Sequence, residues 1–283
     1  MRPILLGALL GIIGLAAVAA GGYWWLGRRA LAIAATPFVV APDTVAIPSD
    51  SASLAEGERL AWLHGCHGCH GDSLQGKVFV DEPRVIRLIA PNITQAIRGY
   101  DDAELVRLIR HGVKRNGTAA FAMPSAGFYH LSDADVGRLV AHLRASPERG
   151  DTWPPTEIRL FTKVALFRGE VPTDAGTMDH GAARIGADAD TSQLALGRYR
   201  ASTICTECHG LTLRGQDNAP ALVQALGYTL PQFTSLMLDG RARDGRDIGL
   251  MGTTAQRRFR RLTSREIEGI WHYLHTLPLA APR

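Results

Sequence analysis

The four cysteines of this 283-residue chain form two pairs with the same spacing, and a histidine follows each pair directly. The two motifs are Cys66, Cys69 and His70, in GCHGCHG, and Cys205, Cys208 and His209, in TICTECHG. Thiol and imidazole groups in such patterns bind zinc, exchange disulfides or attach haem. No cysteine is left over, so each pair is expected to do the same chemistry.

Covalent haem attachment explains the cysteine pairs better than the alternatives. A zinc ribbon places its two cysteine pairs roughly 15–20 residues apart, whereas almost half of the chain separates these pairs. A redox pair needs a βαβ context, and a disulfide within each motif would leave the histidines unexplained. In haem attachment the thiols form thioethers and the next histidine binds iron. We therefore predict His70 and His209 as proximal ligands, and His64 and His67 as polar groups of a loop.

The sixth iron ligand is expected to be a methionine, which suits electron transfer. Met123 and Met251 occupy equivalent places, in loops rich in glycine and alanine, and are predicted to bind the first and second iron respectively. Pro124 follows Met123, whereas Gly252 follows Met251. Met237 is expected in a helix core, and Met237 or His275 is a fallback ligand for the second iron.

A ligating histidine donates its second ring N–H to an acceptor. Ala-Pro pairs stand at similar places in the two long loops, at Pro91 and Pro220. We predict a carbonyl at or near each proline as that acceptor.

Two similar units follow one another along the chain. GYDDAELVRLIRHG (99–112) matches GYTLPQFTSLMLDG (227–240), and LSDADVGRLVAHL (131–143) matches LTSREIEGIWHYL (262–274). The segments 131–143 and 262–274 each open with a capping box at the start of an amphipathic helix, formed by Ser132/Asp135 and by Thr263/Glu266 respectively. No alternating apolar run favours a substantial sheet. Between the units, 157–167 is a short helical candidate.

The N-terminus predicts a membrane anchor. Residues 3–27 lack charged side chains, and this run exceeds the roughly 20 residues that span a bilayer. Tyr23, Trp24 and Trp25 are typical of the interface between membrane and water. A cleaved signal peptide, with an A-x-A site at residues 17–19, is the alternative. The net charge of +4 does not indicate nucleic-acid binding.

The motifs together resemble the class I cytochrome c family. CHGCHG and CTECHG resemble its haem-attachment motif, FAMPS (121–125) its methionine loop, and LSDADVGRLVAHL its terminal helix. With APNIT and IRHGV, the chain is similar to membrane-anchored bacterial dihaem cytochromes c. The resemblance implies two tandem all-α cytochrome c domains with two covalently bound haem c. It also implies attachment to the inner membrane with the domains in the periplasm.

The expected organisation is an anchor (1–29), a tether (30–52), cytochrome c domain 1 (53–146), a linker (147–190) and cytochrome c domain 2 (191–283). The expected function is electron transfer between redox partners, such as a periplasmic dehydrogenase, a respiratory complex or an oxidase. In one form of this expectation, the chain is a subunit of a larger complex. The alternative is a dihaem enzyme, peroxidase-like or thiosulfate-oxidising, with one open haem and with His272 and His275 as distal groups. The arginine-rich stretch 256–261 is either a solvated or propionate-pairing segment, or a docking patch for an acidic partner or anionic lipid.

Overall fold

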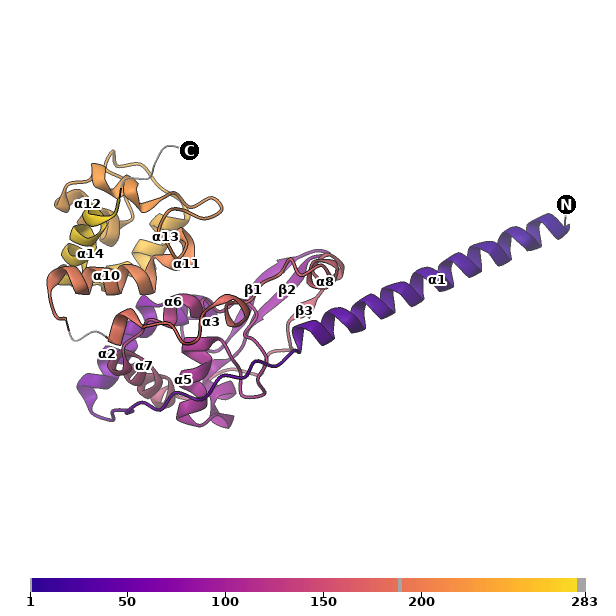
Figure 1. Ribbon diagram of the computed structural model, residues 1–283, viewed down its shortest axis with the longest axis horizontal. Helices are drawn as coiled ribbons and strands as arrows, with labels where there is room; N and C mark the ends of the chain where they lie inside the picture. The colour runs from indigo at the N-terminus through magenta and orange to yellow at the C-terminus, as the bar shows by residue number, and fades with distance from the viewer. Residues whose placement is uncertain (1, 188–189, 279–283) are drawn as a thin grey trace.

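The computed structural model describes residues 2–187 and 190–278, so positions 188–189 of the predicted linker and 279–283 of the predicted second domain lie outside it. A single long helix, α1 (Arg2–Ala34), projects from the rest of the chain (Figure 1). The apolar part of this helix is not buried by other parts of the protein. It continues past the predicted anchor boundary at residue 29, because the segment ALAIA that follows the arginines consists of good helix formers.

The first helical group, residues 51–146, surrounds the first cysteine pair. Its elements are α2 (Ser51–Leu63), α3 (Cys66–His70), α4 (Ile93–Ala96), η1 (Ile97–Gly99), α5 (Asp102–His111), α6 (Ser125–Phe128) and α7 (Asp133–Ala145). Helix α2 crosses α7 at Gly57, where an added Cβ would lie 2.1 Å from the Arg138 carbonyl oxygen. Glycine is therefore required at this crossing.

The second helical group, residues 192–277, has the same order of helices around the second pair. Its elements are α10 (Gln193–Ile204), α11 (Thr206–His209), η3 (Leu222–Gly227), α12 (Leu230–Asp239), α13 (Leu250–Arg257), η4 (Phe259–Arg261) and α14 (Ser264–Thr276). Helix α10 crosses α14 at Gly197, where a Cβ would lie 1.8 Å from the Gly269 carbonyl oxygen. Both groups thus use one glycine for the same close helix crossing.

A small antiparallel sheet adds to the predominantly helical fold, so the expectation of a purely all-α protein was incomplete. Strand β1 (Lys77–Glu82) pairs with β2 (Ile86–Ala90), and β2 pairs with β3 (Glu157–Ile158). The register shifts between Val78 and Val80, and β3 has only two residues. Strands this short and irregular leave little of the period-2 signal that identifies a sheet in sequence.

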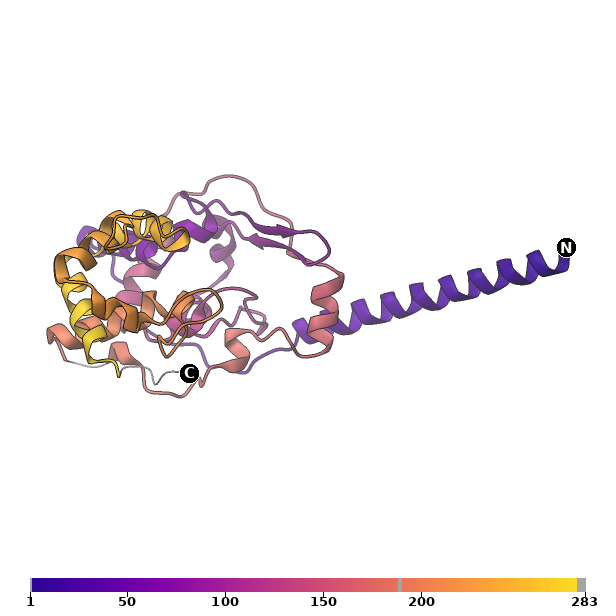
Figure 2. The ribbon, with the colours of Figure 1, turned by 90° about the horizontal axis from the view of Figure 1, so that it is seen from above.

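The segment between the helical groups packs on the molecule rather than hanging free. It contributes β3, α8 (Leu160–Phe167), α9 (Asp174–Thr177) and η2 (Ile185–Ala187). The helical candidate 157–167 is therefore split between a strand and a helix. Helix α8 lies against α1 (Figure 2).

The predicted tether also packs on the first helical group. Phe38 N donates to the Gly117 carbonyl at 2.8 Å, and the Asp43 carboxylate pairs with Arg110 at 3.0 Å. Val45 and Ile47 pack against the hydrophobic core. The chain from α1 to α2 is thereby fixed along its length.

Of the two predicted capping boxes, only the second is complete. Thr263 and Glu266 bond reciprocally at the start of α14. Ser132 accepts a hydrogen bond from Asp135 N at the start of α7, but the Asp135 side chain bonds to Arg200 and Tyr199 instead of returning to the cap. A contact from the second helical group thus replaces half of the box.

Candidate haem-attachment sites

The first motif forms the short helix α3. Gly65, at φ 80°, separates α3 from α2 in a left-handed conformation that favours glycine. Both cysteines are free thiols. Burial raises the pKa of Cys66 to about 12 and also raises that of Cys69. The motif therefore presents two neutral thiols from one helical turn.

His70 is held by one ring nitrogen and leaves the other free. Its Nδ1 donates to the Pro91 carbonyl oxygen at 2.8 Å. A carbonyl only accepts, so the proton lies on Nδ1 and the Nε2 lone pair is available to a metal. Burial lowers the pKa of His70, with the Pro91 bond opposing it, which favours the neutral imidazole that metals bind.

The second motif repeats this geometry at the junction of α10 and α11. His209 Nδ1 donates to the Pro220 carbonyl oxygen at 2.7 Å. Cys205 and Cys208 are free thiols, and burial raises the pKa of Cys205 to about 12. Each motif thus has a histidine oriented by a proline carbonyl.

The loop after each histidine also repeats, which the sequence analysis missed. In both motifs the histidine carbonyl accepts from the glycine six residues later, and the leucine four residues after the histidine has positive φ. Leu74 has φ 61° and Leu213 has φ 58°. The bonds are Gly76 N to His70 O and Ile93 N to Leu74 O in the first loop, and Gly215 N to His209 O and Leu222 N to Leu213 O in the second. The pattern HGxxLxG, present twice at one offset, was the available signal.

The candidate axial methionines lie in different local structures. Met123 lies in an irregular segment just before α6 and packs against the core. Met251 was expected in a loop, but it is the second residue of α13. Gly249, with φ 60°, is the N-cap of that helix, whereas Pro124 is the N-cap of α6 and disfavours a helical conformation at Met123, the residue before it. Met251 also packs against the core.

The fallback ligands Met237 and His275 lie on α12 and α14 respectively. Met237 is 2% exposed in the core of α12. His275 lies on the exposed side of α14 and bonds through Nδ1 to the Trp271 carbonyl at 2.7 Å. His272 is exposed on the same helix near Glu268. Both histidines are therefore exposed side chains of α14.

His64 and His67 are buried, contrary to the expectation of polar loop residues. His64 Nδ1 bonds to the Leu60 carbonyl at 2.9 Å, and burial lowers its pKa to about 3. His67 stacks on Trp62 with ring centroids 4.3 Å apart. The Nε2 atom of each is buried without a hydrogen-bond partner in the described structure. Buried polar atoms are rarely left without a partner in folded proteins, so each of these two requires a specific explanation.

One arginine links the two motifs. Arg258 Nη1 pairs with Glu207 of the second motif at 2.7 Å, while its Nε donates to the Leu63 carbonyl, just before the first motif, at 3.0 Å.

Helix α6 also lies close to the second motif. A Cβ added to Gly127 of α6 would lie 2.9 Å from Thr206 Oγ1. The segment that follows Met123 therefore contacts the second motif.

Three of the four arginines in the arginine-rich stretch contact the first helical group, an arrangement that none of the sequence-based alternatives included. Besides Arg258, Arg257 pairs with Asp72 at 2.5 Å, and Arg261 lies over the Trp62 ring at 4.5 Å. These contacts bind the two helical groups to each other.

A buried ionic group, which we call the interface cluster, joins the two helical groups. Arg200 pairs with Asp135 at 2.9 Å and with Glu266 at 2.6 Å. Arg59 pairs with Glu266 at 2.9 Å, and Tyr199 donates to Asp135 at 2.8 Å. Both carboxylates and Arg200 are buried. Burial alone would raise the pKa of Glu266, but Arg200, Arg59 and the Thr263 cap lower it to about 2.

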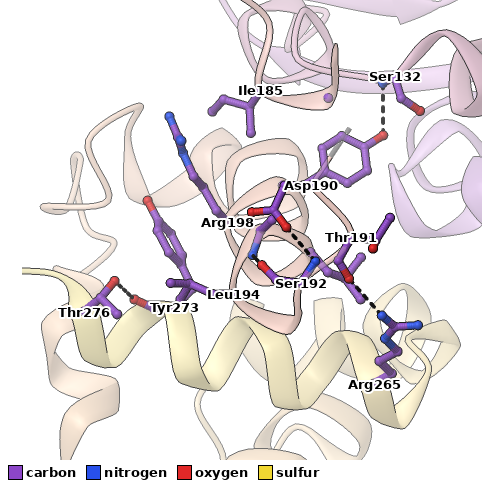
Figure 3. Close-up of a pocket in the computed structure, with 14 residues that line it drawn as sticks. Ser132, Ile185, Asp190, Thr191, Ser192, Leu194, Arg198, Arg265, Tyr273 and Thr276 are labelled. Carbon is purple, nitrogen blue, oxygen red and sulfur yellow. Dashed lines mark hydrogen bonds between the residues drawn. The ribbon is translucent and has the colours of Figure 1, made fainter. Parts of the chain in front are cut away.

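A hollow of about 500 Å³ lies beside this junction, between α10, α14, the α7 N-cap Ser132 and Ile185 of η2 (Figure 3). Its wall includes Arg198, Arg265 and Tyr273. None of the predicted haem-attaching or iron-binding residues lines it, so it is separate from the two motifs.

Comparisons with known proteins agree with the geometry of the first motif. The family model described as cytochrome C oxidase, cbb3-type, subunit III, matches residues 52–143. The chain is also 25% identical over 175 residues to the gluconate 2-dehydrogenase cytochrome c subunit of Pantoea cypripedii. That match covers 56% of this chain and 38% of the relative.

Proposed function

Because this chain is a cytochrome c family protein, we propose that it is a membrane-anchored dihaem electron carrier. The observation that carries the proposal is the duplicated geometry, in which the histidine that ends each CxxCH motif has its Nδ1 fixed by a proline carbonyl. One such motif supports one haem, and its repetition in the second helical group supports a second. The two groups are then tandem cytochrome c domains.

The residues present fit covalent haem. In the first domain Cys66 and Cys69 would form the thioethers, His70 would supply Nε2, and Met123 would supply sulfur. Haem held in this way supplies one-electron redox chemistry. Pro91 keeps the imidazole oriented and neutral through its carbonyl.

The second domain would use Cys205, Cys208 and His209 in the same roles, with Pro220 as the acceptor. Met251 is the proposed sixth ligand, because it occupies the position equivalent to Met123 and packs against the same core. Its place in the first turn of α13 gives it a stiffer backbone than a loop would.

The proposed electron donor is a dehydrogenase. The relative from Pantoea cypripedii is named as the cytochrome c subunit of gluconate 2-dehydrogenase, so a similar subunit role is consistent with this chain. A respiratory complex or oxidase would receive the electrons. With α1 as a retained anchor and the amino terminus inside, both domains lie in the periplasm of the inner membrane.

The test is the haem content of the purified full chain in detergent. We expect two haems per chain by pyridine haemochrome assay, and one after the double substitution Cys205→Ser and Cys208→Ser. The corresponding substitution of Cys66 and Cys69 is the matched comparison and should remove the other haem. One haem in the unaltered chain would refute the dihaem proposal.

The carrier role is tested separately with carbon monoxide and peroxide. Iron with a ligand on both faces leaves no position open, so the dithionite-reduced protein should bind carbon monoxide slowly or not at all. Fast binding together with peroxide turnover would refute the carrier and favour the dihaem enzyme.

A further inference from the structure

Helix α8 presents an apolar face away from the protein. Thr162 and Leu166 are buried against neighbouring elements, whereas Leu160, Phe161 and Phe167 are 40%, 55% and 48% exposed. At 3.6 residues per turn the three exposed side chains lie on one side of the helix. A surface helix of a water-soluble domain usually carries polar residues on that side.

The same helix lies against the end of α1. The rings of Trp25 and Phe167 meet edge to face, with centroids 5.5 Å apart, and Lys163 Nζ lies 3.3 Å from the Tyr23 hydroxyl. Ala30 of α1 is fully buried beside this contact. Figure 2 shows α8 alongside the base of the projecting helix. The position of α8 relative to α1 is therefore defined.

This contact is at the level of the membrane surface, if α1 spans the bilayer as proposed. The uncharged run of α1 ends at Gly27. Tyr23, Trp24 and Trp25 are the aromatic residues expected among the lipid headgroups. The Arg28 guanidinium lies 4.9 Å from the Trp24 ring centroid. Because α8 contacts these residues, its outer face is at the same depth.

The rest of the first helical group holds α8 in place. Phe161 N donates to the Arg84 carbonyl at 2.9 Å, and Thr162 Oγ1 donates to the Val85 carbonyl at 2.7 Å. Arg84 and Val85 form the turn between β1 and β2. Val85 is itself 39% exposed, so the turn extends the apolar face.

We propose that the outer face of α8, formed by Leu160, Phe161 and Phe167, lies in the boundary between lipid headgroups and acyl chains. The occupant is the phospholipid surface itself, since the face continues the lipid-facing surface of α1. The chain then has a second membrane contact beside its anchor, as interfacial helices provide. This inference rests on the proposed anchor.

The test places a photoreactive residue, p-benzoylphenylalanine, at single positions of the full chain. Position 161 tests α8, position 12 in α1 tests the anchor, and position 250 in α13 is the control. Leu250 is 76% exposed, more than the 55% of Phe161, so a lower yield at position 250 cannot come from poorer access. The variants are reconstituted into phosphatidylethanolamine–phosphatidylglycerol liposomes, irradiated, and analysed for lipid adducts by mass spectrometry.

We expect roughly tenfold more lipid adduct at positions 12 and 161 than at position 250, since an interfacial helix is immersed among acyl chains. If position 12 forms lipid adducts but position 161 forms no more than position 250, the proposed contact between α8 and lipid is wrong, while the proposed anchor stands. Only the control level at both would overturn the anchor and the α8 contact together. Placing the residue at 167 gives a second position on the same face, and circular dichroism checks that each variant is folded.

Discussion

Replacing Glu266 by glutamine tests whether the interface cluster stabilises the protein. Glu266 is 3% exposed and pairs with both Arg200 and Arg59. Glutamine keeps the size of the side chain and removes its charge. The ion pair with Arg59, which crosses between the two helical groups, and the ion pair with Arg200, within the second group, are then lost, while Arg200 keeps Asp135 as its remaining carboxylate.

The expected cost follows from the pKa of Glu266, which falls from its ordinary value of 4.5 to about 2 in the folded protein. That difference corresponds to about 3 kcal/mol of stability at neutral pH. A depressed carboxyl pKa contributes fully above pH 4.5, and the contribution is lost as the pH falls towards 2. At pH 3 about 1.4 kcal/mol should remain.

The measurement is the free energy of unfolding in guanidinium, followed by far-UV circular dichroism at pH 7 and pH 3. Glu266→Gln should lower it by about 3 kcal/mol at pH 7 and by less than half of that at pH 3. The matched control is Glu268→Gln, two residues along the same helix, which is exposed. It should change stability by less than about 0.5 kcal/mol.

Two results would refute this reasoning. One is a loss below about 1 kcal/mol at pH 7, the size of an exposed ion pair. The other is a loss that is equal at both pH values, since it would come from packing and not from charge.

Three further substitutions test the sites and the helix crossing. Met123→Leu should open the first iron to carbon monoxide and lower its potential, while Met237→Leu, a core change, should do neither; equal spectra for both variants would rule Met123 out as ligand. Met251→Leu should likewise open the second iron to carbon monoxide and lower its potential. An unaltered carbon monoxide difference spectrum would exclude Met251 as a ligand. Gly197→Ala should cost at least about 2 kcal/mol in the free energy of unfolding, because its Cβ would lie 1.8 Å from the Gly269 carbonyl oxygen; a neutral effect would contradict the close crossing.

The sequence predicted the parts of the sites that depend on local spacing. The histidine after each cysteine pair and the proline carbonyls at Pro91 and Pro220 are such parts, and the structure has both hydrogen bonds. The main helices were also predictable, because their apolar periodicity and their first residues are local signals. Whether Met123 and Met251 bind iron stays a prediction.

Contacts between distant residues could not be predicted in this way. The interface cluster joins Arg59 to Glu266 and Asp135 to Arg200, and single charged residues far apart carry no sign of pairing. The arginine-rich stretch was expected to face solvent, haem propionates or a partner, because a local run of charge does not reveal that Asp72 and Glu207 lie opposite. Strand β3 was missed for the same reason, since its two residues become a strand only beside β2.

The packed segment between α1 and α2 determines how the protein can meet its partners. Phe38, Asp43 and Ile47 are all fixed to the first helical group. If α1 is the retained membrane anchor proposed above, the rest of the protein therefore cannot move away from the bilayer on a flexible tether. It would then meet partners only through lateral diffusion of the whole molecule in the plane of the bilayer. Encounters would occur by a two-dimensional search at one height, and a partner would have to offer its own redox centre at that height.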